Sequence, residues 1–269
     1  MKLEILVATT RRKDLNWISK MNLQCDTIIA NQSDYYGYEE SLYNGKKIQM
    51  LSTKTIGVGK NRNLTLLMSD ADIIIFADDD MSYYDGVENA VKKAFEKLPN
   101  ADVIVFGLDM VRKGSVYERR KENIKKKFLI NSLKYGTCRI AVRREALVKK
   151  NITFSTLFGG GCLYGSGEDS LFLKDCFQSK LRIYSYPHVL GSCSKDYSSW
   201  FTGYDKKFFF DKGALLNAMF PKMKNIVKIY FAIHFLKKSD LNLRTIIRYM
   251  NKGITAFENL TDYREEIES

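Results

Sequence analysis

The chain has 269 residues, of which 45% are hydrophobic and 28% charged, a composition that indicates a folded globular protein and excludes a disordered one. Its 43 Lys and Arg residues outnumber its 31 Asp and Glu residues, which favours polyanionic partners, but the basic residues are scattered and no nucleic-acid partner is expected. The 5 cysteines form no Cys-x-x-Cys pair, which argues against a zinc site and for reduced thiols in a cytoplasmic protein.

The first 110 residues alternate between apolar runs and segments with helical periodicity. Apolar runs predict strands at residues 3–8, 26–30, 47–51, 72–77 and 101–106. Apolar residues at helical spacing predict helices at residues 57–68 and 87–98. Strands that alternate with helices indicate a mainly parallel sheet covered on both faces, so the α/β class is expected.

Shorter runs follow, in which charged and apolar residues mix. They predict antiparallel or edge strands at residues 115–119, 126–130 and 137–142. A glycine-rich loop then leads into a helix predicted near residues 168–179. A final strand is predicted at residues 181–186, ended by Pro187.

The last third of the chain is aromatic and helical. Residues 197–210 hold seven aromatic side chains, which suit a partly buried core or stacking on sugar faces. Helices are predicted at residues 222–237 and 241–260. We predict a catalytic domain over residues 1–215, with a nucleotide-sugar half to about residue 110 and an acceptor half after it, and a helical C-terminal extension over residues 216–269.

Three consecutive carboxylates, Asp78, Asp79 and Asp80, follow the apolar run at residues 72–77. Like charges this close raise one another's pKa, and a bound divalent cation removes that conflict. Ligands of parallel α/β sheets collect at the carboxyl ends of strands, where this triplet is expected. Oxygen ligands favour Mg²⁺ or Mn²⁺. The alternative is a solvated acidic turn that caps the next helix.

The segment IIIFADDD at residues 73–80 resembles the Asp-x-Asp element of GT-A-fold glycosyltransferases, especially the inverting family 2. Four further segments resemble motifs of that family in the same order: VATTRR at 7–12, IANQSD at 29–34, GVGKNRN at 57–63 and GSGED at 165–169. Ala8 stands where the family usually has proline, and Asn31 and Gln32 stand where an acidic residue commonly holds the base. The resemblance implies a Rossmann-like, mostly parallel sheet flanked by helices over about residues 3–190.

The resemblance also implies roles for the triplet. Asp78 would hold the donor's ribose, and Asp80 would bind the Mn²⁺ or Mg²⁺ ion that bridges the two phosphates. Asp79 would either assist through water or be structural. The ion would act as a Lewis acid on the departing nucleoside diphosphate.

Donor binding is expected from Thr9, Thr10, Asn31, Gln32 and Arg62. Thr9 and Asn31 would line the nucleoside pocket, and Arg62 would contact the nucleotide. The alternative for Arg62 is an ion pair with a carboxylate of the triplet.

Asp169 is the candidate general base, which takes a proton from the acceptor hydroxyl, because it lies in the Glu-Asp element of the family. Glu168 is the second candidate and could hydrogen-bond the acceptor. Both residues should lie in the first turn of a helix, where acidic residues are also ordinary capping features.

Two further features are candidates for binding. The glycine run Gly159, Gly160 and Gly161 would let backbone amides approach a phosphate or sugar, or would be a flexible loop. His188 is a candidate metal ligand, because some glycosyltransferases complete the metal shell with a downstream histidine. A lone histidine is more often structural.

Residues 223–238 place apolar residues at helical spacing among Lys222, Lys224, Lys228, Lys237 and Lys238. This pattern fits a basic helix on an anionic bilayer, or a helix that packs its apolar face on the catalytic domain or a second subunit. No run of about 18 apolar residues predicts a transmembrane span.

We therefore predict an inverting, metal-dependent glycosyltransferase that moves a sugar from a nucleotide-diphosphate sugar, expected to be a UDP-sugar, to a hydroxyl of a glycan or lipid-linked glycan. The family suggests bacterial surface polysaccharide synthesis, at a cytoplasmic location with contact to the inner face of the membrane. The alternatives are a sugar-nucleotidyltransferase, against which the glycine-free segment after the first strand counts, and a non-catalytic protein that binds membranes or glycans.

Overall fold

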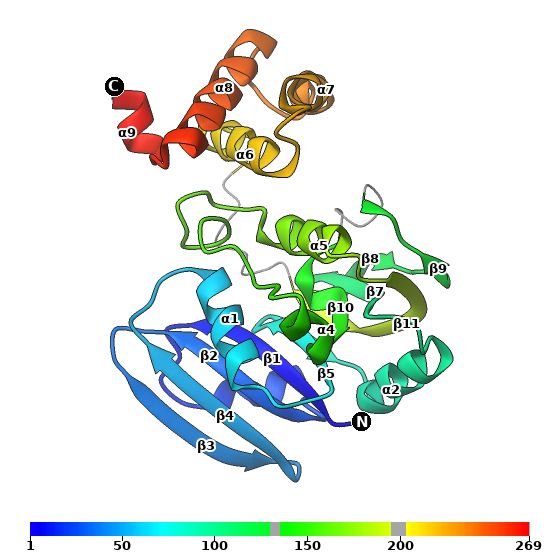
Figure 1. The fold of residues 1–269 in the computed structure, drawn as a ribbon. Helices are drawn as coiled ribbons and strands as arrows, with labels where there is room; N and C mark the ends of the chain where they lie inside the picture. The colour runs from blue at the N-terminus through cyan, green and yellow to red at the C-terminus, as the bar shows by residue number, and fades with distance from the viewer. Residues whose placement is uncertain (130–134, 195–202, 269) are drawn as a thin grey trace.

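The computed structural model describes residues 1–129, 135–194 and 203–268. The strands form an 11-stranded mixed sheet (Figure 1). They are β1 (Leu3–Thr10), β2 (Asp26–Gln32), β3 (Gly37–Tyr43), β4 (Lys46–Thr53), β5 (Ile73–Asp78), β6 (Met81–Tyr83), β7 (Val103–Arg112), β8 (Ser115–Arg120), β9 (Lys125–Lys126), β10 (Ile140–Arg143) and β11 (Ile183–Ser194). The strand order is β3-β4-β2-β1-β5-β10-β7-β11-β6, with β8 on β7 and β9 on β11.

The helices of the described residues cover the sheet or form a group at the C-terminus. They are η1 (Asn16–Met21), α1 (Val58–Met68), α2 (Val87–Lys97), η2 (Thr137–Arg139), α4 (Arg144–Lys149), α5 (Glu168–Gln178), α6 (Lys206–Met219), α7 (Lys224–Leu236), α8 (Leu243–Asn259) and α9 (Tyr263–Glu268).

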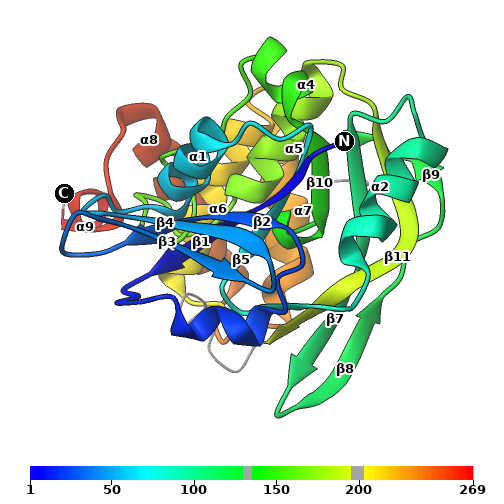
Figure 2. The same ribbon diagram turned by 90° about the horizontal axis from the view of Figure 1, so that it is seen from below.

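The four adjacent strands β4, β2, β1 and β5 are parallel. Alternate β1 side chains enter two cores: Ile5 packs in the core that holds Ile18 of η1, and Leu6 in the core that holds Leu66 of α1 and Phe172 of α5. Figure 2 shows α1 and α5 together on one side of β1 and β2. The prediction of an α/β sheet flanked by helices is therefore confirmed.

Register brings the ends of these strands together. Thr9 of β1 lies opposite Asn31 of β2, and Ala8 of β1 lies opposite Asp78 of β5. The carboxyl ends of parallel strands thus form one edge, as expected for the ligand site of an α/β sheet.

Several predicted strands differ from the structure. β3 was missed because it is an edge strand, largely exposed, without a continuous apolar face. The strand predicted at residues 126–130 is wrong over residues 127–129, since β9 contains only Lys125 and Lys126; residue 130 lies outside the described residues. The predicted stop at Pro187 is also wrong, because β11 continues to Ser194 through a register shift between Ser185 and Val189, where a proline is tolerated.

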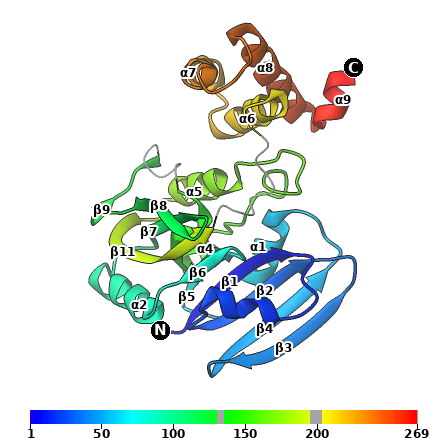
Figure 3. The same ribbon diagram turned by 180° about the vertical axis from the view of Figure 1, so that it is seen from behind.

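The C-terminal helices α6–α9 are confirmed as a helical group, which lies beyond α5 and away from β3 and β4 (Figures 1 and 3). The boundary predicted between residues 215 and 216 falls inside α6. Tyr197, Trp200 and Phe201 of the predicted aromatic stretch lie outside the described residues, whereas Phe209 and Phe210 are fully buried. No helix of the described residues is long and apolar enough to cross a membrane.

We predict that Gly253→Ala destabilises the protein by about 1–3 kcal/mol. Helices α6 and α8 contact each other closely at Gly213 and Gly253. A Cβ on Gly253 would lie 1.9 Å from the Phe210 carbonyl oxygen, and a Cβ on Gly213 would lie 2.0 Å from the Met250 carbonyl oxygen. The clash outweighs the gain in helix propensity, which is about 1 kcal/mol. Urea unfolding would measure the change, with the exposed Thr255→Ala as control. Unchanged or increased stability would contradict the prediction.

Candidate functional site

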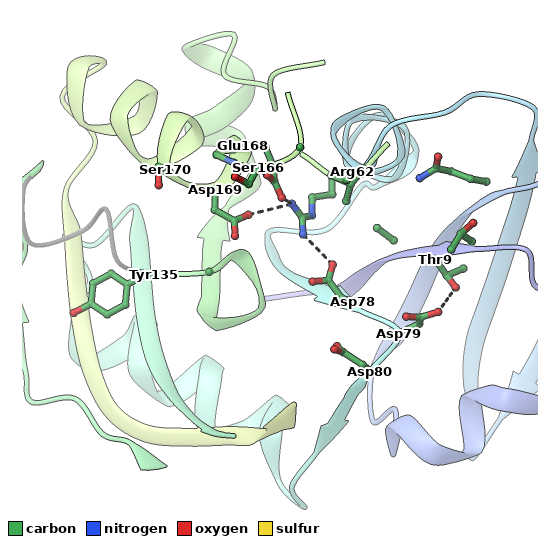
Figure 4. Close-up of a pocket in the computed structure, with 18 of the residues that line it drawn as sticks. Thr9, Arg62, Asp78, Asp79, Asp80, Tyr135, Ser166, Glu168, Asp169 and Ser170 are labelled. Atoms are coloured by element: carbon green, nitrogen blue, oxygen red, sulfur yellow. Dashed lines mark hydrogen bonds and ion pairs between the residues drawn. The ribbon is translucent and has the colours of Figure 1, made fainter. Parts of the chain in front are cut away.

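A pocket of about 740 Å³ opens at the carboxyl ends of the parallel strands. It is lined by the ends of β1 and β2, by α1, by the triplet after β5, by the start of α5 and by Lys212 of α6. Figure 4 shows Asp78, Asp79 and Asp80 on one wall of the pocket, with Glu168 and Asp169 across from Asp78. The structure therefore brings both predicted carboxylate groups into one cavity.

Arg62 joins the two groups. Its side chain is only 3% exposed, and its guanidinium donates to Asp78 Oδ1 at 2.9 Å, to Glu168 Oε1 at 3.0 Å and to Asp169 Oδ1 at 3.1 Å (Figure 4). Burial disfavours the charge, but the three carboxylates outweigh it and raise the pKa of Arg62 well above its usual value. The structure thus shows the ion pair that was the alternative prediction for this residue.

Asp79 is held by the end of β1. Its Oδ2 accepts a hydrogen bond from Thr9 Oγ1 at 2.5 Å and from Arg12 Nη2 at 2.7 Å. Of the two roles predicted for Asp79, this geometry fits the structural one, because the oxygen is already occupied by protein donors. Thr9 lines the pocket as predicted.

Of the three carboxylates in the triplet, Asp80 accepts the fewest hydrogen bonds from protein donors. Its Oδ1 is buried without a hydrogen-bond partner among the described residues, and its Oδ2 accepts from Cys193 Sγ at 3.3 Å. Burial, followed by the charges of Asp78 and Asp79, raises the pKa of Asp80 to about 6. An orphaned carboxylate oxygen beside two other carboxylates fits a hard divalent cation.

A divalent ion at Asp80 would need further ligands. Within residues 1–129, 135–194 and 203–268, no group of three or more His, Cys, Asp or Glu side chains could hold a metal. Mg²⁺ is commonly bound by one or two carboxylates together with substrate phosphates. Asp80 is suited to supply one such carboxylate ligand.

One carboxylate oxygen of Asp169 is held by two side chains. Oδ1 accepts from Arg62 and from Thr137 Oγ1. A Cβ on Gly136 would lie 3.5 Å from Oδ2, so the glycine leaves room beside this oxygen. Burial and the charge of Glu168 outweigh Arg62 and raise the pKa of Asp169 to about 7. A carboxylate of this pKa suits a general base at neutral pH.

The predicted nucleoside residues divide into two groups. Thr10 and Gln32 line the pocket, and Gln32 Oε1 accepts from the Gly57 backbone N–H at 2.8 Å. Asn31 does not line it, because its amide is fully buried and is bonded to the Arg12 backbone and to Ser52 Oγ. Asn31 instead fixes the loop that carries Arg12.

The glycine run packs against the start of α1. Gly160 lines the pocket, but its carbonyl accepts from the Val58 N–H at 2.9 Å. A Cβ on Gly159 would lie 2.5 Å from Val58 Cγ1 and 2.9 Å from Glu168, and one on Gly161 would lie 3.1 Å from Ile56. These contacts give the run a close-packing role.

His188 does not line the pocket. Because β11 continues past Pro187, it is Cys193 that pairs opposite Met81 and contacts Asp80. His188 lies five residues earlier along the strand, which is roughly 16 Å at the usual rise. The structure thus does not bring His188 and the triplet together.

Lys212 and Cys138 belong to the site but were not predicted. Lys212 lines the pocket, donates to Ser166 Oγ at 3.1 Å and forms no salt bridge with the described residues. Cys138 Sγ donates to Asp78 Oδ2 at 3.1 Å. A lysine in a distant helix and a cysteine outside any motif give no sequence signal, because only tertiary packing brings them to the pocket.

No family model and no curated protein matches the sequence. Solved structures do match. S. aureus TarS 1-349 in complex with UDP-GlcNAc is similar to this chain, with a TM-score of 0.62 and 13% identity over 98% of this chain and 93% of that chain. The complex of TarS 1-349 with UDP has a TM-score of 0.58 and 16% identity, over 96% of this chain and 71% of that chain. A further structure of S. aureus TarS has a TM-score of 0.56 and 15% identity, over 96% of this chain and 43% of that chain. The chain therefore shares the fold of these structures, a mixed α/β sheet flanked by helices.

Arg62→Met is expected to lower the free energy of unfolding by about 3–5 kcal/mol at pH 8, because it leaves three carboxylates without their cation. The loss should be smaller at pH 5, because the pKa of Asp169 is about 7 and this carboxylate is then protonated. Urea unfolding at both pH values would measure it, with the exposed Lys60→Met of the same helix as control. A loss below about 1 kcal/mol at pH 8 would contradict the central role of Arg62.

Asp80→Asn should stabilise the protein at pH 8 by about 1–3 kcal/mol. The folded pKa of Asp80 is about 6, above its ordinary value of 3.8. The contribution of Asp80 to the free energy of unfolding is therefore fully present below pH 4, where the carboxyl is protonated, and is lost as the pH rises through 6. The variant, which cannot ionise, should be more stable than the wild type at pH 8 but not at pH 4. Thermal unfolding would measure this, with the exposed Asp240→Asn as control. Equal shifts at both pH values would argue against a buried, ionised Asp80.

Proposed function

We propose that this protein is an inverting glycosyltransferase that moves a sugar from a UDP-sugar to an acceptor hydroxyl. The observation that carries the proposal is that the triplet faces Glu168 and Asp169 within the same pocket. The likeness to S. aureus TarS, whose structures hold UDP-GlcNAc and UDP, supports a UDP-sugar donor. A bacterial surface glycopolymer is the proposed acceptor class.

In this proposal the nucleoside lies at the ends of β1 and β2. Gln32 Oε1 is held by Gly57, which turns the amide so that Nε2 can donate to a carbonyl of the base. Asp78 accepts from the ribose hydroxyls, since each of its oxygens keeps a second lone pair beside the bonds to Arg62 and Cys138.

Asp80 would hold Mn²⁺ or Mg²⁺ through Oδ1, the oxygen without a protein donor. The ion, when bound with the nucleotide, would supply Lewis-acid stabilisation of the diphosphate. Asp79 stays bonded to Thr9 and Arg12 and fixes the backbone that positions Asp80.

Asp169 would take the proton. The acceptor oxygen bonds to the anomeric carbon, the bond from that carbon to the diphosphate oxygen breaks, and the hydroxyl proton moves to Asp169 Oδ2. Gly136 leaves room for the acceptor beside this oxygen. Arg62 and Thr137 hold Oδ1, so the carboxylate keeps its orientation. Glu168 would orient the acceptor, and Lys212 would place positive charge at this side of the pocket.

We expect Asp169→Asn to bind donor like the wild type but to lose transfer by about 10²–10⁴-fold. The wild-type rate should rise with pH up to about 7, where Asp169 becomes ionised. UDP release with a panel of glycan acceptors would measure transfer, and calorimetry would measure donor binding. Asp175→Asn, six residues along the same helix and outside the pocket, is the matched control. Wild-type transfer by Asp169→Asn would exclude this residue as the base.

The class of reaction has its own test. Calorimetry with UDP-GlcNAc and with other UDP-, GDP- and TDP-sugars, each with and without Mn²⁺, should give binding that requires the ion and that Asp80→Ala abolishes. Binding of none of these compounds, or pyrophosphate release from UTP and a sugar 1-phosphate, would overturn the proposal in favour of another function or of nucleotidyl transfer.

A further inference from the structure

Helix α7 presents apolar residues on two opposite faces. Its inner face packs in the core of the C-terminal helices through Val227, Ala232 and Phe235. Its outer face exposes large apolar side chains: Met223 just before the helix at 54%, Ile226 at 69%, Ile229 at 51%, Tyr230 at 69% and Ile233 at 56%. We call these five residues the α7 stripe. Globular helices normally bury one apolar face and leave the other polar, so the stripe lacks an explanation in the fold.

Positive charge surrounds the stripe. Residues 222–239 contain five lysines and no acidic residue. Lys224 is paired with Glu258, but Lys222, Lys237 and Lys238 are exposed. Apolar side chains beside lysines are the pattern of a helix that lies in a membrane interface.

Helix α8 extends the basic surface. Arg244, Arg248 and Lys252 line a shallow depression on α8 together with Asn251. Lys228 of α7 donates to Asn251 Oδ1 at 2.6 Å, so the depression adjoins α7. An arginine pair in a shallow depression suits phosphate oxygens, because guanidinium groups bind them in a bidentate way.

We propose that the α7 stripe and the adjacent basic surface of α8 dock on an anionic lipid bilayer. The stripe would enter the headgroup and acyl boundary, while the arginines and lysines would contact lipid phosphates. A second copy of this chain fits less well, because a symmetric contact would bring two sets of these cations together. Figures 1 and 3 show α7 at the opposite end of the molecule from β3 and β4.

Flotation of the full chain with vesicles tests the proposal without any nucleotide or sugar, so its outcome is independent of the proposed function. The protein should float with vesicles of equimolar phosphatidylcholine and phosphatidylglycerol and not with phosphatidylcholine alone. Ile226→Glu with Ile229→Glu should reduce partitioning by about tenfold or more. The matched control is Leu42→Glu with Leu67→Glu, at 77% and 80% exposure on β3 and α1, which should float like the wild type.

The charge contribution is tested separately. Lys237→Gln with Lys238→Gln should weaken partitioning by about fivefold per lysine, whereas Lys93→Gln with Lys97→Gln on α2 should not change it. Failure of the wild type to float, or equal flotation of the stripe variant, would overturn the proposal. Light scattering that finds a wild-type dimer and a monomeric stripe variant, with no flotation of either, would assign the face to a subunit interface instead.

Discussion

One buried cation stabilises the carboxylates that line the pocket. Arg62 lies on α1, yet it binds a carboxylate at the end of β5 and two at the start of α5. Without it, carboxylates from three positions of the chain would meet in a poorly solvated cavity, which is costly. Because Asp78 and Asp169 share this cation, the charge state of the donor side of the pocket affects that of the proposed base.

Identical residues in the triplet acquire different chemistry from their surroundings. Asp78 is bonded to Arg62 and Cys138, Asp79 to Thr9 and Arg12, and Asp80 keeps an oxygen without a partner. Asp78 ends β5, whereas Asp79 and Asp80 lie in the turn that follows, and each side chain meets different donors. The pocket therefore contains a carboxylate fixed by protein and a neighbour that can accept a cation.

The sequence predicted what depends on local pattern and missed what depends on tertiary contact. The apolar run of β5 and the acidic residues after it predicted a triplet at the carboxyl end of a parallel strand, and the structure has a pocket there, because strand ends of a parallel sheet meet at one edge. The Asn31 side chain is buried in the protein, whereas the Gln32 side chain lines the pocket, because successive residues of a strand point to opposite faces. His188 was misjudged because β11 continues past Pro187, and Lys212 was invisible because α6 reaches the pocket only through the packed fold.

The glycine crossing of α6 and α8 also has a mechanical consequence. Gly213, which fixes α6 against α8, is the immediate neighbour of Lys212 in the pocket wall. Backbones in such intimate contact cannot slide past each other without a clash, so the helices shift as one rigid body. A displacement of α8 would therefore be transmitted through α6 to Lys212 in the pocket wall.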